Sequence, residues 1–199
     1  MKTMRIKKRN FIHLLLLAGI LPLLSSCGYN RMIELEESVS AQWAQVENVY
    51  QRRADLIPNL VNTVKGYADF EQETLTGVIE ARAKATSVTI DPGNLNTESI
   101  QQFQAAQEGL SSALSRLMVV VERYPDLKAN QNFLDLQSQL EGTENRIAVE
   151  RRKFNDTTRN YNTYIRRFPA LITASIFGFD QKAYFEAAEG TDKPPTVEF

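Results

Sequence analysis

The sequence predicts an all-α protein that folds as an antiparallel helical bundle. Apolar residues repeat at alternating steps of three and four along several stretches, which is the spacing of a helix that buries one face. Turn signals separate these stretches. The two-residue alternation of a half-buried strand is almost absent, and its best candidate is the short run 87–90. A composition of 43% hydrophobic and 24% charged residues is typical of a globular domain.

The first helical stretch covers residues 30–87 and predicts one long rod. Its apolar seam consists of Val39, Trp43, Val46, Tyr50, Arg53, Ile57, Leu60, Val64 and Tyr67. Pro58 has no backbone N–H, so we expect it to kink the helix around Asp55, and Gly66 weakens the helix further along. Trp43 is the largest apolar residue of the seam and is expected to be at least partly buried.

Turn signals divide the remaining chain into three further helices. Residues 91–94 form a turn, residues 97–99 open a medium-length helix, and Tyr124-Pro125 ends it. A second long seam follows, with Phe133, Gln137, Leu140, Glu144, Ile147, Arg151, Phe154, Thr158, Tyr161, Ile165 and Phe168. The apolar segment 171–185, bent at Gly178, predicts a short C-terminal helix. These helices can close an antiparallel bundle with the seams inside.

The N-terminal residues predict an export signal followed by a lipid anchor. A basic stretch ends at Arg9, residues 11–24 are almost wholly apolar, and Leu24-Ser25-Ser26-Cys27 resembles the lipobox of bacterial lipoproteins. An apolar run of about 14 residues is shorter than the roughly 20 that a spanning helix needs. We therefore expect residues 1–26 to be cleaved and Cys27 to be lipidated. The alternatives are ordinary secretory cleavage near Ser26 and an uncleaved N-terminal anchor.

This interpretation divides the chain into a signal peptide (1–26), a helical bundle (27–189) and a flexible C-terminal tail (190–199). Acyl chains such as palmitate on Cys27 would hold the mature protein on a membrane of the bacterial cell envelope, because two chains convert marginal binding into stable anchoring. The domain would then face the periplasm. Gly28 stands where inner-membrane lipoproteins commonly carry Asp, which favours the outer membrane in a diderm host.

The charge and the residue types argue against several classes of function. Residues 1–27 contain five of the 23 basic residues and none of the 24 acidic ones, so the remainder carries a net charge of −6. An acidic domain is poorly suited to nucleic acid. The single His and the single Cys are His13 and Cys27, so the mature domain offers no catalytic residues of the common hydrolase types, no zinc ligands and no expected cofactor. The acidic pairs Glu36-Glu37 and Glu71 with Glu73 are interpreted as solvated helix faces.

The segment Arg52-Arg53-Ala54-Asp55-Leu56-Ile57-Pro58-Asn59-Leu60-Val61 resembles the LemA family. Later segments agree with the family pattern, namely Glu122 to Lys128, Leu140 to Ala148, Phe154-Asn155, Tyr161-Asn162, Phe168-Pro169 and Phe177-Gly178-Phe179. The resemblance runs from about Tyr29 to Phe185. It implies an elongated antiparallel four-helix bundle whose N-terminus is held at a membrane, although many members begin with a transmembrane helix rather than a lipobox. It implies no enzymatic activity.

A candidate buried polar cluster interrupts the two long seams. Arg53 breaks the first seam, whereas Glu144 and Arg151, about 10.5 Å apart along one helix face, break the last. Antiparallel packing could pair Arg53 with Glu144, and Arg151 with Asp55 or Asn59. Our favoured hypothesis is a non-enzymatic lipoprotein that presents a helical surface to an envelope protein partner. The alternative is a ligand-binding protein or enzyme that uses this cluster.

Overall fold

The computed structural model describes the backbone of residues 8–66 and 71–186, and the side chains from residue 28 onward within those ranges. The side chains of the predicted signal peptide and Cys27, and all of the predicted tail 190–199, lie outside the described residues. Within the described part, no helix is both long and apolar enough to span a membrane.

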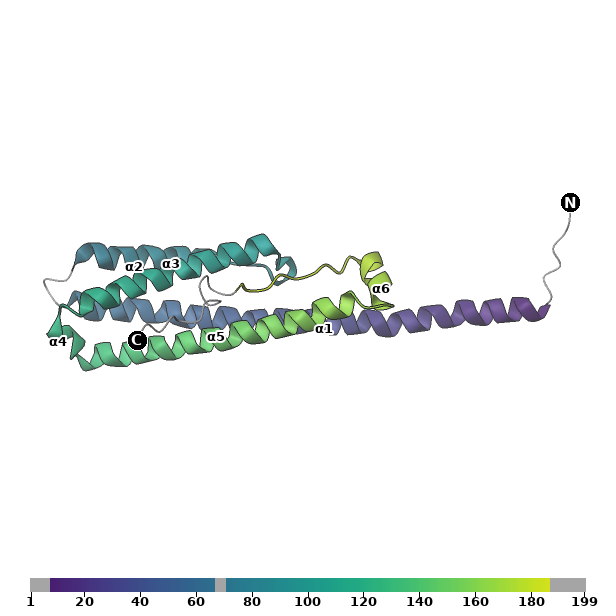
Figure 1. Cartoon of the computed structure of the whole chain (residues 1–199), viewed down its shortest axis with the longest axis horizontal. Coiled ribbons are helices and arrows are strands. Elements are labelled where there is room, and N and C mark those ends of the chain that lie inside the picture. Colours follow the sequence, from purple (N-terminus) through teal and green to yellow (C-terminus); the bar gives the residue numbers. More distant parts are fainter. Residues whose placement is uncertain (1–7, 67–70, 187–199) are drawn as a thin grey trace, which may run out of the picture.

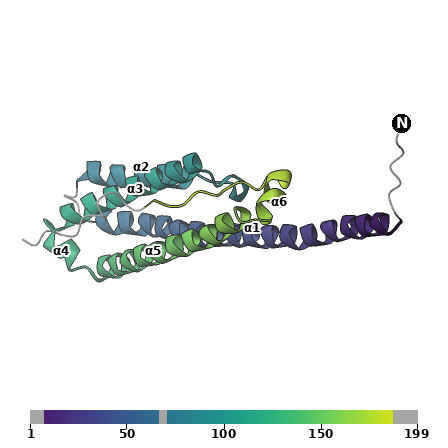
Figure 2. The ribbon, with the colours of Figure 1, turned by 45° about the vertical axis from the view of Figure 1, so that its right-hand side comes forward.

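Four long antiparallel helices lie side by side and form an elongated bundle (Figure 1). They are α1 (Lys8–Lys65), α2 (Gln72–Ser87), α3 (Thr97–Val121) and α5 (Gln131–Ile165), joined by η1 (Pro92–Asn94) and α4 (Pro125–Lys128) and followed by α6 (Ala170–Phe177). Helices make up 83% of the described residues, which contain no strand, so the predicted fold class is confirmed. Both views place α6 beside α1, and α1 projects beyond it (Figure 2).

The prediction of one continuous rod over residues 30–87 is wrong. The helix ends at Lys65, and α2 returns antiparallel to α1 and packs against α3. The reason is apolar burial, since α2 carries its own buried residues, Leu75, Val78 and Ala85. If α2 extended α1 in a straight line, these side chains would pass beyond the start of α5 and lose their cover. Gly66 therefore lies at a reversal of the chain.

Helix α1 runs through Pro58 without interruption. Proline lacks the N–H that would bond to the carbonyl four residues earlier, which belongs to Ala54. The Arg82 Nε of α2 donates to that carbonyl at 2.8 Å. A side chain from the neighbouring helix thus replaces the missing bond and joins α2 to α1.

The predicted seams face the interior. All eight described seam positions of α1, from Val39 to Val64, are buried, and Trp43 is fully enclosed, as expected. On α5 the apolar positions from Phe133 to Ile165 are buried, whereas Phe168, beyond the helix end, is 81% exposed. The buried apolar residues form two separate clusters, one at the α4 end of the bundle and one at the α6 end.

The C-terminal segment 179–186 packs along the bundle as extended chain rather than as helix. Gly178 caps the C-terminus of α6, and its φ of +74° is the left-handed conformation that glycine adopts readily. Beyond it, side-chain amides of α5 hold the backbone. Asn162 bonds to both the N–H and the C=O of Lys182, and Asn155 does the same for Phe185, at 2.8–3.0 Å. Phe185 thereby enters the core beside Trp43, 5.9 Å between ring centroids.

Candidate functional site: a polar layer between two cores

A layer of polar side chains crosses the bundle between its two apolar clusters. On α1 the layer falls between Tyr50 and Ile57, and on α5 between Leu140 and Ile147, which belong to opposite clusters. At its centre lies Arg53, with 1% of its surface exposed. A buried guanidinium needs hydrogen bonds and a counter-charge to offset its desolvation. The surrounding helices supply both.

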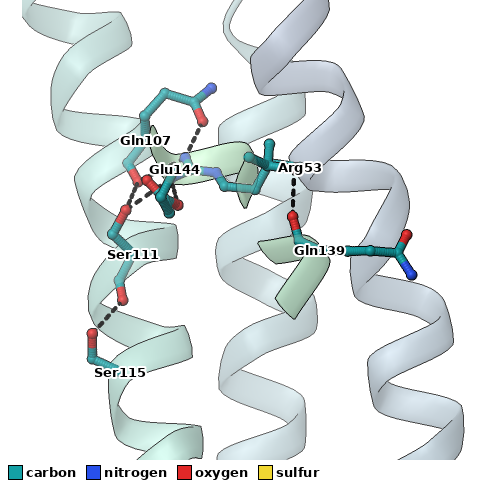
Figure 3. Close-up of polar contacts among 7 residues, drawn as sticks. Arg53, Gln107, Ser111, Ser115, Gln139 and Glu144 are labelled. Carbon is teal, nitrogen blue, oxygen red and sulfur yellow. Dashed lines mark hydrogen bonds and ion pairs between the residues drawn. The ribbon is translucent and has the colours of Figure 1, made fainter. Parts of the chain in front are cut away.

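Arg53 is bonded by three residues from two other helices (Figure 3). One terminal nitrogen donates to Glu144 Oε1 of α5 at 2.7 Å and to Ser111 Oγ of α3 at 2.9 Å. The other donates to Gln107 Oε1 of α3 at 2.7 Å and to the Gln107 backbone carbonyl at 3.2 Å. The planar fork of arginine suits this divided recognition.

Gln107 and Ser111 belong to the layer although the sequence did not indicate them. Gln107 is 6% exposed, and its amide nitrogen donates to the Ala85 carbonyl of α2 at 3.0 Å. The bonds that begin at Arg53 therefore link α1, α3 and α5, and Gln107 adds α2. Both α3 residues flank the apolar seam by one position, where a polar residue ordinarily faces water. Their bonds to the arginine across the bundle bring them into the layer.

The predicted pair of Arg53 and Glu144 is buried on one side only. The two residues form an ion pair at 2.7 Å, but the Glu144 side chain is 46% exposed. Beside the layer lies a cavity of about 80 Å³ lined by Tyr50, Ala54, Ala85, Phe103 and Gln107, among others. Burial raises the pKa of the Tyr50 hydroxyl, although the guanidiniums of Arg151 and Arg53 partly lower it. At neutral pH Tyr50 is therefore an uncharged neighbour of the layer.

The structure does not bring Arg151 to Asp55 or Asn59. Those two residues follow Arg53 by two and six positions, which turns them about 200° and 240° away around the helix, and both are exposed. Asp55 accepts from Gln51 at 2.7 Å. Arg151 instead lies over the Phe185 ring, 4.8 Å from its centroid, and donates to the Glu186 carbonyl at 2.8 Å. Arg151 thus fastens the C-terminal segment to α5.

Glu36 and Glu71, one from each acidic pair noted in the sequence, each bind a basic side chain instead of forming a carboxylate pair. Glu36 forms an ion pair with Lys182 at 2.9 Å, and Glu71 pairs with Arg123. In the side chains that the structure describes, no group of three or more Asp, Glu, His or Cys residues could hold a metal ion.

Two faces of the bundle are hollowed into open grooves. One, of about 630 Å³, runs between α1 and α5 and is lined in part by Arg52, Gly142, Arg146 and Val149. A smaller groove of about 330 Å³ shares Arg52, Gly142 and Arg146 with it. The other large groove, of about 750 Å³, lies between α2 and α3 around Gly77. No side chain approaches within 4 Å of where a Cβ at Gly142 would lie, so this glycine leaves its groove open.

The fold and the layer define a class of protein, an elongated antiparallel helical bundle with a buried arginine at its centre. Comparison with known proteins identifies the class, because the model of the LemA family matches residues 42–199. The chain belongs to the LemA family. It is 28% identical to the magnetosome protein MamQ of Magnetospirillum gryphiswaldense over 83% of this chain and 67% of that protein. It is 22% identical to the protein LemA of Metamycoplasma hominis over 80% of this chain and 69% of that protein.

Proposed function

We propose that this LemA-family protein is a lipoprotein of the bacterial cell envelope, anchored through Cys27, that binds an envelope protein on the surface of its bundle and catalyses no reaction. The observation that carries the non-enzymatic part is the closure of the polar layer. The two terminal nitrogens of Arg53 are engaged by Glu144, Ser111 and Gln107, and the adjoining cavity of about 80 Å³ is far below the 300–1,000 Å³ of small-molecule sites.

The groove between α1 and α5 is the surface that we assign to the partner. It lies between the two longest helices, and Arg52, Arg146 and Lys153 line it together with a single carboxylate, Glu150. The charge of Glu150 is already engaged by Lys153 at 2.9 Å, and this contact lowers the pKa of Glu150. A partner helix with an acidic face would meet the two arginines, which bind carboxylates with good geometry.

The anchor is tested by replacing Cys27. In Cys27→Ser the thiol that carries the lipid is missing, so we expect the protein to leave the detergent phase in phase partitioning, whereas the wild type stays in it. Mass spectrometry of the N-terminal peptide reads the modification directly. Ser38→Ala, an exposed change on α1, serves as the control and should partition like the wild type. An unmodified Cys27 in the wild type would contradict lipidation, and a peptide beginning before Cys27 would indicate an uncleaved anchor.

The partner groove is tested by filling it. Gly142→Trp places an indole in the groove between α1 and α5, where space is open, so the bundle should fold while partner binding falls by at least tenfold. Gly109→Trp is the matched control, because Gly109 is exposed, helical, equally free of neighbours and outside the grooves described. Photo-crosslinking in cells followed by co-purification of the anchored protein supplies the measurement. Equal capture by the two variants contradicts the assignment, and loss in Gly77→Trp alone would move the site to the α2–α3 groove.

A further inference from the structure

Helix α6 exposes most of its apolar side chains. Leu171 and Ile172 are about half exposed, at 52% and 53%, and Phe177 and Ile176 are exposed by 60% and 72%. Only its two alanines, Ala170 and Ala174, are buried against the bundle. A short helix that buries alanines and presents Leu, Ile and Phe to the outside is the reverse of a soluble amphipathic helix. Such an exposed apolar surface is typical of a site that another molecule or a membrane covers.

Helix α6 also lies close to the N-terminus of the predicted mature protein. Tyr29, the second residue after Cys27, contacts Phe177 and Phe179 with ring centroids 4.9 Å and 5.7 Å away. Two residues correspond to a rise of about 3 Å along a helix. The exposed apolar face of α6 therefore adjoins the proposed anchor, and any bilayer that holds Cys27 comes within reach of α6. Both ribbon views show α6 at that end of the bundle (Figures 1 and 2).

Guanidinium groups gather at this end, although the domain as a whole is acidic. Arg31, Arg159 and Arg167 line a groove of about 370 Å³ between α1 and α5, and Arg166 follows directly on α5. Arg31 and Arg159 each have a local carboxylate partner, Glu34 and Asp156. Within the described residues, no ion pair includes Arg166 or Arg167, and both are exposed. Apolar and cationic side chains side by side are typical of a surface that lies on anionic lipid.

We propose that α6 docks on the anionic bilayer surface, with Leu171, Ile172, Ile176 and Phe177 entering the interface and Arg166 and Arg167 meeting lipid phosphates. The inference rests on the proposed anchoring at Cys27. A single-point tether leaves the rod free to tilt, whereas a second contact at α6 fixes the angle at which the bundle and its grooves leave the membrane. Interfacial helices gain affinity from buried apolar area together with attraction to anionic headgroups, and α6 offers both.

The experiment places a reporter on α6 and an equally exposed one elsewhere. Ile176 and Val119 are both 72% exposed, and Val119 lies near the α4 end of α3. Acylated full-length mature protein carrying Ile176→Trp or Val119→Trp is reconstituted into phosphatidylglycerol–phosphatidylethanolamine vesicles that contain brominated acyl chains. The native Trp43 is fully buried and contributes the same background to both variants. We expect quenching of the Ile176→Trp emission to exceed that of Val119→Trp by at least threefold, and to fall when phosphatidylcholine replaces the anionic lipid.

Flotation of the vesicles on a density gradient separates the two proposals. A protein that does not float contradicts the anchoring, and with it the docking of α6. A protein that floats while the two reporters are quenched equally contradicts the docking alone. A blue shift of the Ile176→Trp emission without bromine quenching would mean that protein covers α6, which also overturns the inference. Quenching of the Ile176→Trp emission that is unchanged in phosphatidylcholine would contradict the proposed docking on an anionic surface through Arg166 and Arg167.

Discussion

Replacing Phe154 with Ala should lower the free energy of unfolding by about 3–5 kcal/mol, the cost typical of removing a buried phenyl group. Phe154 has no exposed surface and lies edge-on to Trp43 and to Phe185, with ring centroids 5.5 Å away in both cases. Its removal leaves a cavity where α1, α5 and the C-terminal segment meet. Chemical denaturation followed by circular dichroism measures the loss, and the emission of the single Trp should shift to longer wavelength in the native variant.

Phe177→Ala is the matched control, because it deletes the same atoms from a ring that is 60% exposed. We expect it to cost less than about 1 kcal/mol in the protein free of membrane. Comparable losses in the two variants would contradict the placement of Phe154 in the core. A native Phe154→Ala whose Trp emission equals that of the wild type would contradict the contact between the two rings.

The seams could be predicted from the sequence because they are local. A step of three or four residues fixes which side chains share a helix face, and burial of that face follows from the hydrophobic effect alone. Trp43, Phe133 and Phe154 were placed correctly for this reason. The chain reversal after Gly66 was not predicted, since the pattern of α2 continues that of α1 and only the packing of α2 against α3 and α1 decides the direction.

Contacts between distant segments could be predicted only in part. Charges inside an apolar seam indicate that something must satisfy them, and this argument led to Arg53 and Glu144, which the structure brings together. The partners that lie beside a seam carry no such signal. Gln107 resembles any solvated glutamine until the guanidinium across the bundle is known. The same holds for Arg82, whose bond to the Ala54 carbonyl depends on which helix packs beside Pro58.

The extended C-terminal segment shows a further limit. Its apolar residues predicted a helix bent at Gly178, and the helical half of that prediction is α6. The second half is held in extended form by the amides of Asn155 and Asn162, each bonding one backbone N–H and one C=O. Each asparagine thus bonds the backbone as a neighbouring β-strand would. No periodicity in residues 179–186 predicts these bonds.

Glu144→Ala should destabilise the bundle by about 2–3 kcal/mol. The substitution leaves the Arg53 guanidinium, only 1% exposed, without its counter-charge, because Ser111 and Gln107 are neutral. The expected loss is below the 3–5 kcal/mol of a fully buried pair because Glu144 is 46% exposed and water can reach this side of the layer. Glu141→Ala, one turn earlier on the exposed face of α5, is the control and should change stability by no more than about 0.5 kcal/mol.

Combining this change with Arg53→Met tests whether the two residues act as a pair. Methionine keeps most of the arginine volume without the charge, and Glu144 can then turn to water, so Arg53→Met should cost less than about 2 kcal/mol. In that background Glu144→Ala has no buried charge to strand and should cost about 0.5 kcal/mol or less. The resulting coupling of roughly 2 kcal/mol is read from denaturation of the wild type, both single variants and the double variant. Additive losses would mean that the ion pair contributes nothing to the stability of the bundle. A double variant that folds as stably as Arg53→Met but no longer binds the partner would instead make the polar layer part of the binding site.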